Sequence, residues 1–83
     1  MKALLRRILS ESVQLHVPLD TLDDDADLYA AGLESIATVH LMLAIEENFG
    51  IEIPDRLLTR QLFSSIDSMA AAIDELQEQK VTP

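Results

Sequence analysis

The sequence predicts an all-α fold, a small antiparallel-type bundle of three long helices and one short helix. Three stretches place apolar residues at helical spacing, and residues typical of helix starts and ends flank them. The apolar stretch at residues 51–53 is too short to form a sheet. The chain has 83 residues, which predicts one domain over residues 1–83.

The first expected helix covers about residues 2–16. Its apolar positions recur at i, i+3 and i+4, and polar residues occupy the opposite face. Pro18 should end this helix, because the residue before a proline is disfavoured in the α region. The apolar positions are Leu4, Leu5, Ile8, Leu9, Val13 and Leu15.

A long loop without clear periodicity should connect the first helix to the second, over residues 17–34. A loop of this length in a compact domain is usually functional or is held down by its own apolar side chains. The candidate anchors are Leu19, Leu22, Leu28 and Leu33.

The second expected helix covers residues 35–48, and Gly50 suits its C-terminal end because glycine takes positive φ freely. Leu41, Met42 and Ile45 have the spacing of a core face. A second apolar set also recurs at helical spacing. Such a wide apolar arc indicates either burial on several sides or a face offered to a partner. This second set is Ile36, Val39 and Leu43.

The remaining helices are expected in the last third of the chain. Residues 55–63 should hold one short helical turn or more, with Leu57, Leu58, Leu62 and Phe63 facing inward. Ser64 or Ser65 should cap a last helix that runs to about residue 79, and residues 81–83 should fray. The apolar stripe of this helix is Ile66, Met69, Ala70, Ile73 and Leu76.

The charge and the composition of the chain argue against several classes of partner and site. The net charge of −9 argues against nucleic acid and against anionic membranes, because phosphate contacts need clustered lysine and arginine. There is no cysteine, so thiolate metal sites and disulfides are excluded. The first seven residues interrupt an apolar pattern with charges, so we expect neither a signal peptide nor a membrane span. We therefore expect a cytoplasmic protein.

An acidic run over residues 23–27 offers a partial match to a calcium-binding loop. Asp23, Asp25, Asp27 and Glu34 fall at loop positions 1, 3, 5 and 12 of an EF-hand. The sixth position normally needs glycine for a sharp turn, and here it is Leu28. We therefore expect no specific metal site, and the acidic run is either solvated or weakly associated with divalent ions.

Ser35 stands where the loop becomes the second helix. The first backbone N–H groups of a helix lack intrahelical partners, so an exposed serine there suits a phosphate ester. The flanking residues, Asp27-Leu28 and Gly32-Leu33-Glu34-Ser35-Ile36, resemble the attachment site of the acyl carrier protein family. A second segment, residues 46–54 (EENFGIEIP), is also similar to that family. Glu34 replaces the usual aspartate and Ile36 the usual leucine.

The resemblance implies a carrier and not an enzyme, with no catalytic residue of its own. A phosphopantetheinyl transferase would attach 4′-phosphopantetheine to Ser35, and acyl- or aminoacyl-ligases or synthases would load and use the carrier. Such a carrier is expected to be a monomer. The fatty-acid, polyketide, peptide and aminoacyl pathways stay open. The rival hypothesis is an unmodified acidic helical module that binds a partner protein.

The resemblance also implies a partner-binding face on the second helix, whose usual acids are partly absent. Residues 35–44 contain no acid, and Arg56 and Arg60 follow where the family is often acidic. We therefore expect a mostly apolar face and a specialised carrier with dedicated partner enzymes. The predicted partner-binding residues are Leu33, Glu34, Ile36, Val39, Leu43, Glu46 and Glu47.

Overall fold

The computed structural model describes the backbone of residues 1–81 and the side chains of residues 1–78. Three α-helices are present in this part of the chain, α1 (Lys2–Ser12), α2 (Ser35–Phe49) and α3 (Ile66–Val81). Two 3-10 turns lie in the long connections, η1 (Leu19–Thr21) and η2 (Asp55–Leu57). No strand occurs within residues 1–81, so the all-α class is confirmed. The short helix expected in residues 55–63 is present only as the turn η2.

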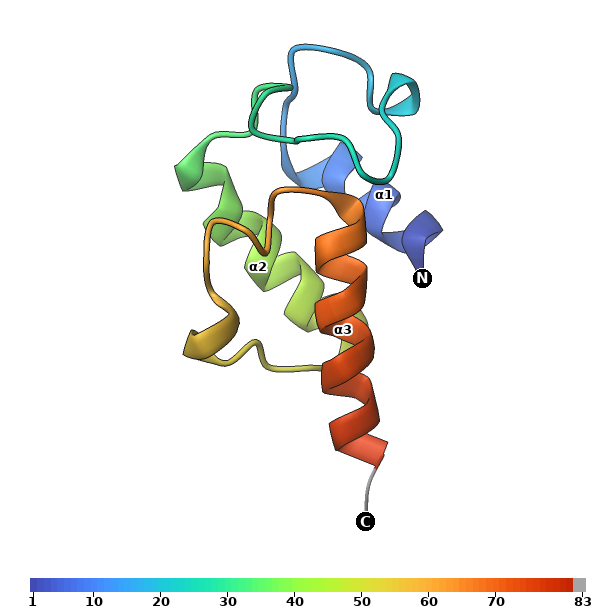
Figure 1. The fold of residues 1–83 in the computed structure, drawn as a ribbon, viewed down its shortest axis with the longest axis vertical. Coiled ribbons are helices and arrows are strands. Elements are labelled where there is room, and N and C mark those ends of the chain that lie inside the picture. Colours follow the sequence, from blue (N-terminus) through green and yellow to red (C-terminus); the bar gives the residue numbers. More distant parts are fainter. Residues whose placement is uncertain (82–83) are drawn as a thin grey trace.

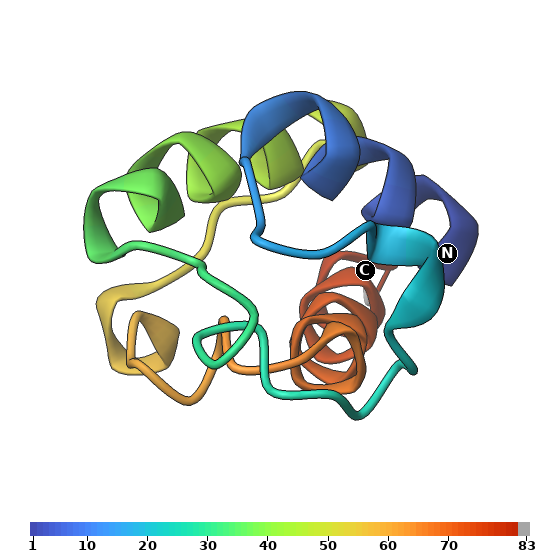
Figure 2. The same ribbon diagram turned by 90° about the horizontal axis from the view of Figure 1, so that it is seen from above.

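The helices surround one apolar core. Helix α1 packs against both α2 and α3 (Figure 1). Seen from above, α1 and α2 lie next to each other, and α3 is viewed nearly end-on below them (Figure 2). None of the helices in the described chain has the length and apolar character needed to cross a bilayer. The largest fully buried side chains are Leu5, Leu9, Leu28, Leu41, Ile45, Ile66, Met69 and Ile73.

Helix α1 ends a full turn earlier than the sequence predicts. The prediction of a helix to residue 16 is wrong, because Val13 is already extended with φ −134° and ψ 156°. Alternate side chains of an extended segment point to the same side. Val13 and Leu15 accordingly pack on the core, while Gln14 and His16 are exposed. An extended segment that packs Val13 and Leu15 on the core therefore stands where the last helical turn was predicted. The helix ends well before Pro18.

Contacts to α1 and α3 hold down the long loop, residues 13–34. Leu28 and Leu33 are buried and Leu19 and Leu22 pack partly against the core, so the predicted anchors are confirmed. The Arg6 guanidinium on α1 donates to the loop carbonyls of Leu19 (3.2 Å) and Leu22 (2.8 Å).

The same loop is tied to the start of α3 by backbone hydrogen bonds. The Leu28 N–H donates to the Ser64 carbonyl (2.8 Å), and the Asp67 N–H donates to the Asp24 carbonyl (3.0 Å). Lys2 and Arg6 also pair with the Asp24 carboxylate, at 3.6 and 2.8 Å. The loop thereby reaches α2 along a defined path.

The connection from α2 to α3 adds a second set of core residues. Leu57 is partly buried against the core, but Leu58 is 38% exposed, so the prediction that Leu58 faces inward is wrong. The buried apolar residues of this connection are Ile51, Ile53, Leu62 and Phe63.

The start of α3 follows the predicted capping pattern. Ser65, immediately before the helix, accepts the Ser68 N–H at 3.0 Å through its hydroxyl. The helix reaches Val81, two residues further than expected, so the fraying predicted at residue 81 is wrong. The other residues predicted to fray, 82–83, lie outside the described residues.

Candidate functional site

Ser35 is the first residue of α2, as the sequence predicts. Glu34 before it has an extended backbone, φ −90° and ψ 150°, which marks the point where the loop ends. The Ser35 side chain is exposed, and its hydroxyl makes no hydrogen bond to any residue that the structure describes. The backbone carbonyl of Ser35 accepts the Thr38 hydroxyl. The hydroxyl therefore makes no cap and is free to react.

A tight series of turns delivers the chain to Ser35. The Asp27 carboxylate accepts the backbone N–H groups of Tyr29 (3.0 Å) and Ala30 (3.4 Å), an Asx-type turn. The Leu28 carbonyl then accepts the N–H groups of Ala31 (3.1 Å) and Leu33 (3.0 Å). The acidic end of the motif thus shapes the loop that presents the serine.

Gly32 is required by this path for two reasons. Its φ of +111° lies where L-residues are strained. A Cβ on Gly32 would also lie 2.8 Å from ring atoms of His16, which packs over it. His16 is held there by its own N–H, which donates to the Ala31 carbonyl at 2.7 Å.

The acidic run does not fold as a calcium loop. Among the described residues, positive φ occurs only at glycines, so Leu28 does not make the sharp turn that position six of such a loop needs. No three metal-ligating side chains gather in the described part of the chain. Asp24 instead pairs with Arg6, and this hydrogen bond is the main reason that the pKa of the Asp24 carboxyl is lowered.

The start of α2 favours an anion. The helix has no acidic residue in its first turn and no side-chain hydrogen bond at its N-terminal cap. The positive end of its dipole is therefore not offset by a carboxylate within the helix, an arrangement that stabilises nearby negative charge by roughly 0.3–1 kcal/mol.

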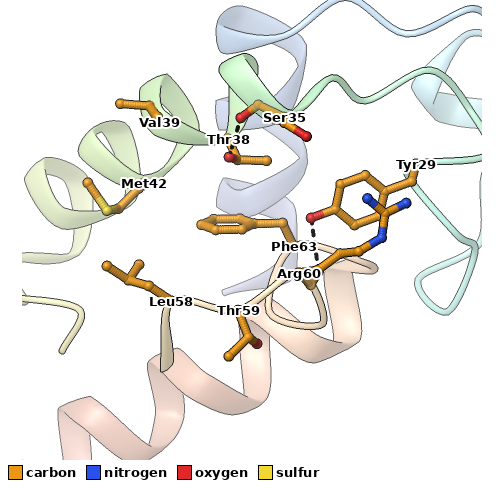
Figure 3. Close-up of a pocket in the computed structure, with 9 residues that line it drawn as sticks. All are labelled: Tyr29, Ser35, Thr38, Val39, Met42, Leu58, Thr59, Arg60 and Phe63. Carbon is orange, nitrogen blue, oxygen red and sulfur yellow. Dashed lines mark hydrogen bonds between the residues drawn. The ribbon is translucent and has the colours of Figure 1, made fainter. Parts of the chain in front are cut away.

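A cleft of about 350 Å³ opens beside Ser35, between α2 and the segment before α3 (Figure 3). In this view Val39, Met42 and Leu58 lie on one side of the cleft, and Tyr29 and Arg60 lie on the other. The lining residues are Tyr29, Ser35, Thr38, Val39, Met42, Leu58, Thr59, Arg60 and Phe63.

Two of the lining residues form a pair across the cleft wall. The Arg60 guanidinium carbon lies 3.9 Å from the centroid of the Tyr29 ring, and the Tyr29 hydroxyl donates to the Arg60 carbonyl at 2.9 Å. Partial burial raises the pKa of Tyr29, against the opposing effect of the Arg60 cation. The phenol is therefore protonated at neutral pH and stays a hydrogen-bond donor.

The second apolar set on α2 is solvent-exposed. Ile36, Val39 and Leu43 are 71, 52 and 53% exposed, so of the two interpretations of the wide apolar arc, core packing is ruled out. Together these three residues are called the apolar face below. Their exposure leaves an apolar surface on α2 next to Ser35.

The other predicted partner-binding residues differ in their surroundings. Glu34 and Glu47 are exposed. Leu33 is only 5% exposed and belongs to the core, so little of this side chain is available to a partner. The Glu46 carboxylate is partly buried and accepts the Ile53 N–H at 2.8 Å, which gives this residue a structural task within the chain.

Most residues that line the cleft are not among the functional residues that the sequence predicts. Thr59 and Arg60 reach it from the connection between α2 and α3, far from Ser35 in the sequence, so no local spacing connects them. Tyr29 comes from the loop just before Ser35, and its place in the cleft depends on its contacts with Arg60. One feature of the sequence could have indicated the cleft, namely Arg56 and Arg60, which stand where the family is often acidic. These two arginines indicate an unusual positive charge, but the sequence does not show that Arg60 lies in the same cleft as Ser35.

Comparisons with known proteins agree with this geometry. The family described as "Phosphopantetheine attachment site" matches residues 3–73. An aminoacyl carrier protein of Agrobacterium fabrum is 56% identical over 69 residues, 83% of each chain. An acyl carrier protein of Akkermansia muciniphila is 37% identical over 65 residues, 77% of this chain and 79% of the relative.

A solved structure extends the likeness to three dimensions. It is a crystal structure of an engineered Bradyrhizobium japonicum glycine:[carrier protein] ligase complexed with a carrier protein from Agrobacterium tumefaciens and AMP. The match has a TM-score of 0.86 and 53% identity and covers 89% of this chain and 99% of the solved chain. The chain therefore belongs to the phosphopantetheine attachment family, the carrier proteins that hold their cargo on a phosphopantetheine arm.

Proposed function

We propose that Ser35 is the residue that carries the 4′-phosphopantetheine arm, and that the cargo is an amino acid or a small acyl group. The observation that carries the proposal is the exposed, unbonded Ser35 hydroxyl at the start of α2, at the mouth of a cleft. The site fits the group, because the hydroxyl is free for esterification and the helix start favours the phosphate charge. When attached, the arm supplies the thiol that this cysteine-free chain lacks.

The chain's own residues present the arm and do no chemistry on the cargo. Asp27 and Gly32 shape the loop that holds Ser35 outward, and Leu28 and Leu33 anchor that loop in the core. Fixing the attachment point in this way raises the effective concentration of the cargo at a docked enzyme. A phosphopantetheinyl transferase is the enzyme class that this proposal requires for attachment.

An aminoacyl cargo is favoured by the relatives. The Agrobacterium fabrum relative is named an aminoacyl carrier protein, and the solved carrier is bound to a glycine:[carrier protein] ligase. We propose that a stand-alone aminoacyl-ligase of this kind loads the present chain, and that the chain serves dedicated partners and not a general fatty-acid or polyketide synthase. Ile36, Val39 and Leu43 would form the centre of the ligase contact, with Glu34 and Glu47 at its rim.

Three further features belong to the proposal. The carrier is a monomer in the cytoplasm, which light scattering and cell fractionation would test. Residues 55–63 form the short fourth helix of the bundle in solution, which backbone chemical shifts would test. None of these three features is needed for attachment of the arm.

Intact-mass analysis tests the central assignment. The protein is incubated with coenzyme A and a broad-specificity phosphopantetheinyl transferase, in parallel with Ser35→Ala and the control Ser10→Ala, whose serine lies on α1. We expect the wild type and Ser10→Ala to gain one phosphopantetheine and Ser35→Ala to gain none while keeping its fold. Modification of the Ser35→Ala variant would refute the assignment, and a folded wild type that gains nothing would favour the unmodified interaction module.

A further inference from the structure

Arg60 differs from the other lysine and arginine side chains that the structure describes. Within the side chains that the structure describes, it is the one lysine or arginine without a carboxylate at ion-pairing distance; its guanidinium lies on the Tyr29 ring instead. The cations that have carboxylate partners are Lys2, Arg6, Arg7 and Arg56. The positive charge of Arg60 is therefore available for an anion from outside the folded chain.

Two contacts set the position of this charge. The Tyr29 ring supports the guanidinium face, an arrangement that attracts cations. The Tyr29 hydroxyl also holds the backbone carbonyl of Arg60 at 2.9 Å. Both contacts come from the loop that delivers Ser35, so the guanidinium and the serine are positioned by the same segment.

Arg60 and Ser35 line the same cleft. In Figure 3 the Ser35 hydroxyl points toward the side of the cleft where Tyr29 and Arg60 lie, and away from Val39 and Met42. The start of α2, which has no acidic residue in its first turn, lies on the other side of that hydroxyl. An anion on the Ser35 oxygen would thus meet a helix dipole and a guanidinium together.

We propose that Arg60 binds the phosphodiester that joins the arm to Ser35, an inference that rests on the proposed function. A guanidinium presents parallel N–H donors that match two oxygens of a phosphate, which a lysine ammonium does not. The contact orients the arm from its first bonds toward the side of the cleft where Tyr29 and Arg60 lie, and away from Val39, the residue of the apolar face that also lines this cleft. It leaves Ile36, Val39 and Leu43 free for a partner while the arm is at rest.

The experiment uses the phosphopantetheine-modified protein in four forms, wild type, Arg60→Gln, Arg60→Lys and the control Arg56→Gln. Arg56 is also exposed but pairs with Glu75, and it does not line the cleft of Ser35. Intact mass first establishes that each form carries the arm on Ser35. The readouts are the phosphorus-31 resonance of the phosphodiester and the side-chain Nε–H resonances of the arginines before and after modification.

If Arg60 binds the phosphodiester, its Nε–H resonance shifts when the arm is added, and that of Arg56 does not. In Arg60→Gln the phosphorus resonance moves toward its value in the urea-unfolded protein, Arg60→Lys lies between, and Arg56→Gln matches the wild type. High salt should move the wild-type resonance in the same direction as Arg60→Gln, because the pair is exposed to solvent.

Two other outcomes overturn the inference in distinguishable ways. If the arm is on Ser35 but the phosphorus resonance is the same in wild type and Arg60→Gln, the proposed function stands and Arg60 only supports the cleft wall. If the wild type gains no arm on Ser35, the proposed function fails, and the inference fails with it.

Discussion

The two ends of α2 are built in different ways. The C-terminal end is held by contacts within the chain. Gly50 ends the helix at φ 65°, and the Glu46 carboxylate accepts the Ile53 N–H. At the N-terminal end the structure has no side-chain cap, Ser35 is exposed, and the apolar Ile36 follows it to the surface. A helix that needed only stability would have a cap at both ends. The open end is the one where we propose that Ser35 carries the arm, so local stability is given up where the proposed function needs access.

The largest expected effect compares the glycines that flank α2. Gly32→Val should lower the unfolding free energy by about 3 kcal/mol, because it combines strained φ with a clash against His16. Gly50→Asn should cost less than about 1 kcal/mol, because φ 65° lies in the left-handed region that asparagine tolerates. Urea unfolding measures both. Equal losses would mean that the path at Gly32 has no special geometry.

The next prediction concerns the apolar face. Val39→Ala and Leu43→Ala should each slow loading by the cognate ligase roughly 30-fold, which corresponds to about 2 kcal/mol for a truncated interface anchor. Both side chains are half exposed, so the melting temperature should change little. Loading rates are compared at two salt concentrations.

Glu47→Gln is the matched control for this face, because a rim charge mainly tunes association rate. It should slow loading less than either truncation. Strongly salt-sensitive loading, with the largest loss in Glu47→Gln, would contradict an apolar recognition face. Efficient turnover by a general fatty-acid synthase would contradict the dedicated-partner proposal.

A third prediction compares neighbouring acids on α2. Glu46→Ala should cost about 1–2 kcal/mol, because the partly buried Ile53 N–H loses its charged acceptor. Glu47→Ala should stay within about 0.5 kcal/mol, as is usual for exposed positions. Denaturant unfolding of the two variants under the same conditions provides the measurement. Equal unfolding free energies of the two variants would show that the Glu46 hydrogen bond contributes nothing to the stability of the fold.

The smallest effect should come from the ion pairs that tie the loop before Ser35. The Arg6 hydrogen bond lowers the pKa of Asp24 in the folded state, so this contribution to stability is complete above the unfolded pKa of about 3.9. It is lost as the pH falls through the lower, folded-state pKa. Asp24→Asn should therefore melt slightly lower at pH 7 and show a shallower decline on acidification. Parallel melting curves from pH 7 to pH 2.5 test this, and identical slopes would contradict it.

The sequence by itself determined the features that depend on local spacing. Helical periodicity and glycine chemistry placed both ends of α2 within one residue, and the residues around Ser35 indicated the carrier family. Leu28 and Leu33 were predicted as anchors of a loop without periodicity, because a long loop in a small domain needs apolar side chains to hold it. These inferences concern neighbours in sequence, where periodicity and backbone preference apply directly.

Only the tertiary structure decided which distant groups meet. The end of α1 at Ser12, the exposure of Leu58 and the pairing of Tyr29 with Arg60 each depend on segments brought together by the core. Leu58 has the same apolar character as its buried neighbours, and burial depends on where the 3-10 turn η2 ends. The hydrogen bond from the Ile53 N–H to the Glu46 carboxylate likewise forms only because the chain after α2 folds back against the helix. The periodicity of α2 does not predict this contact.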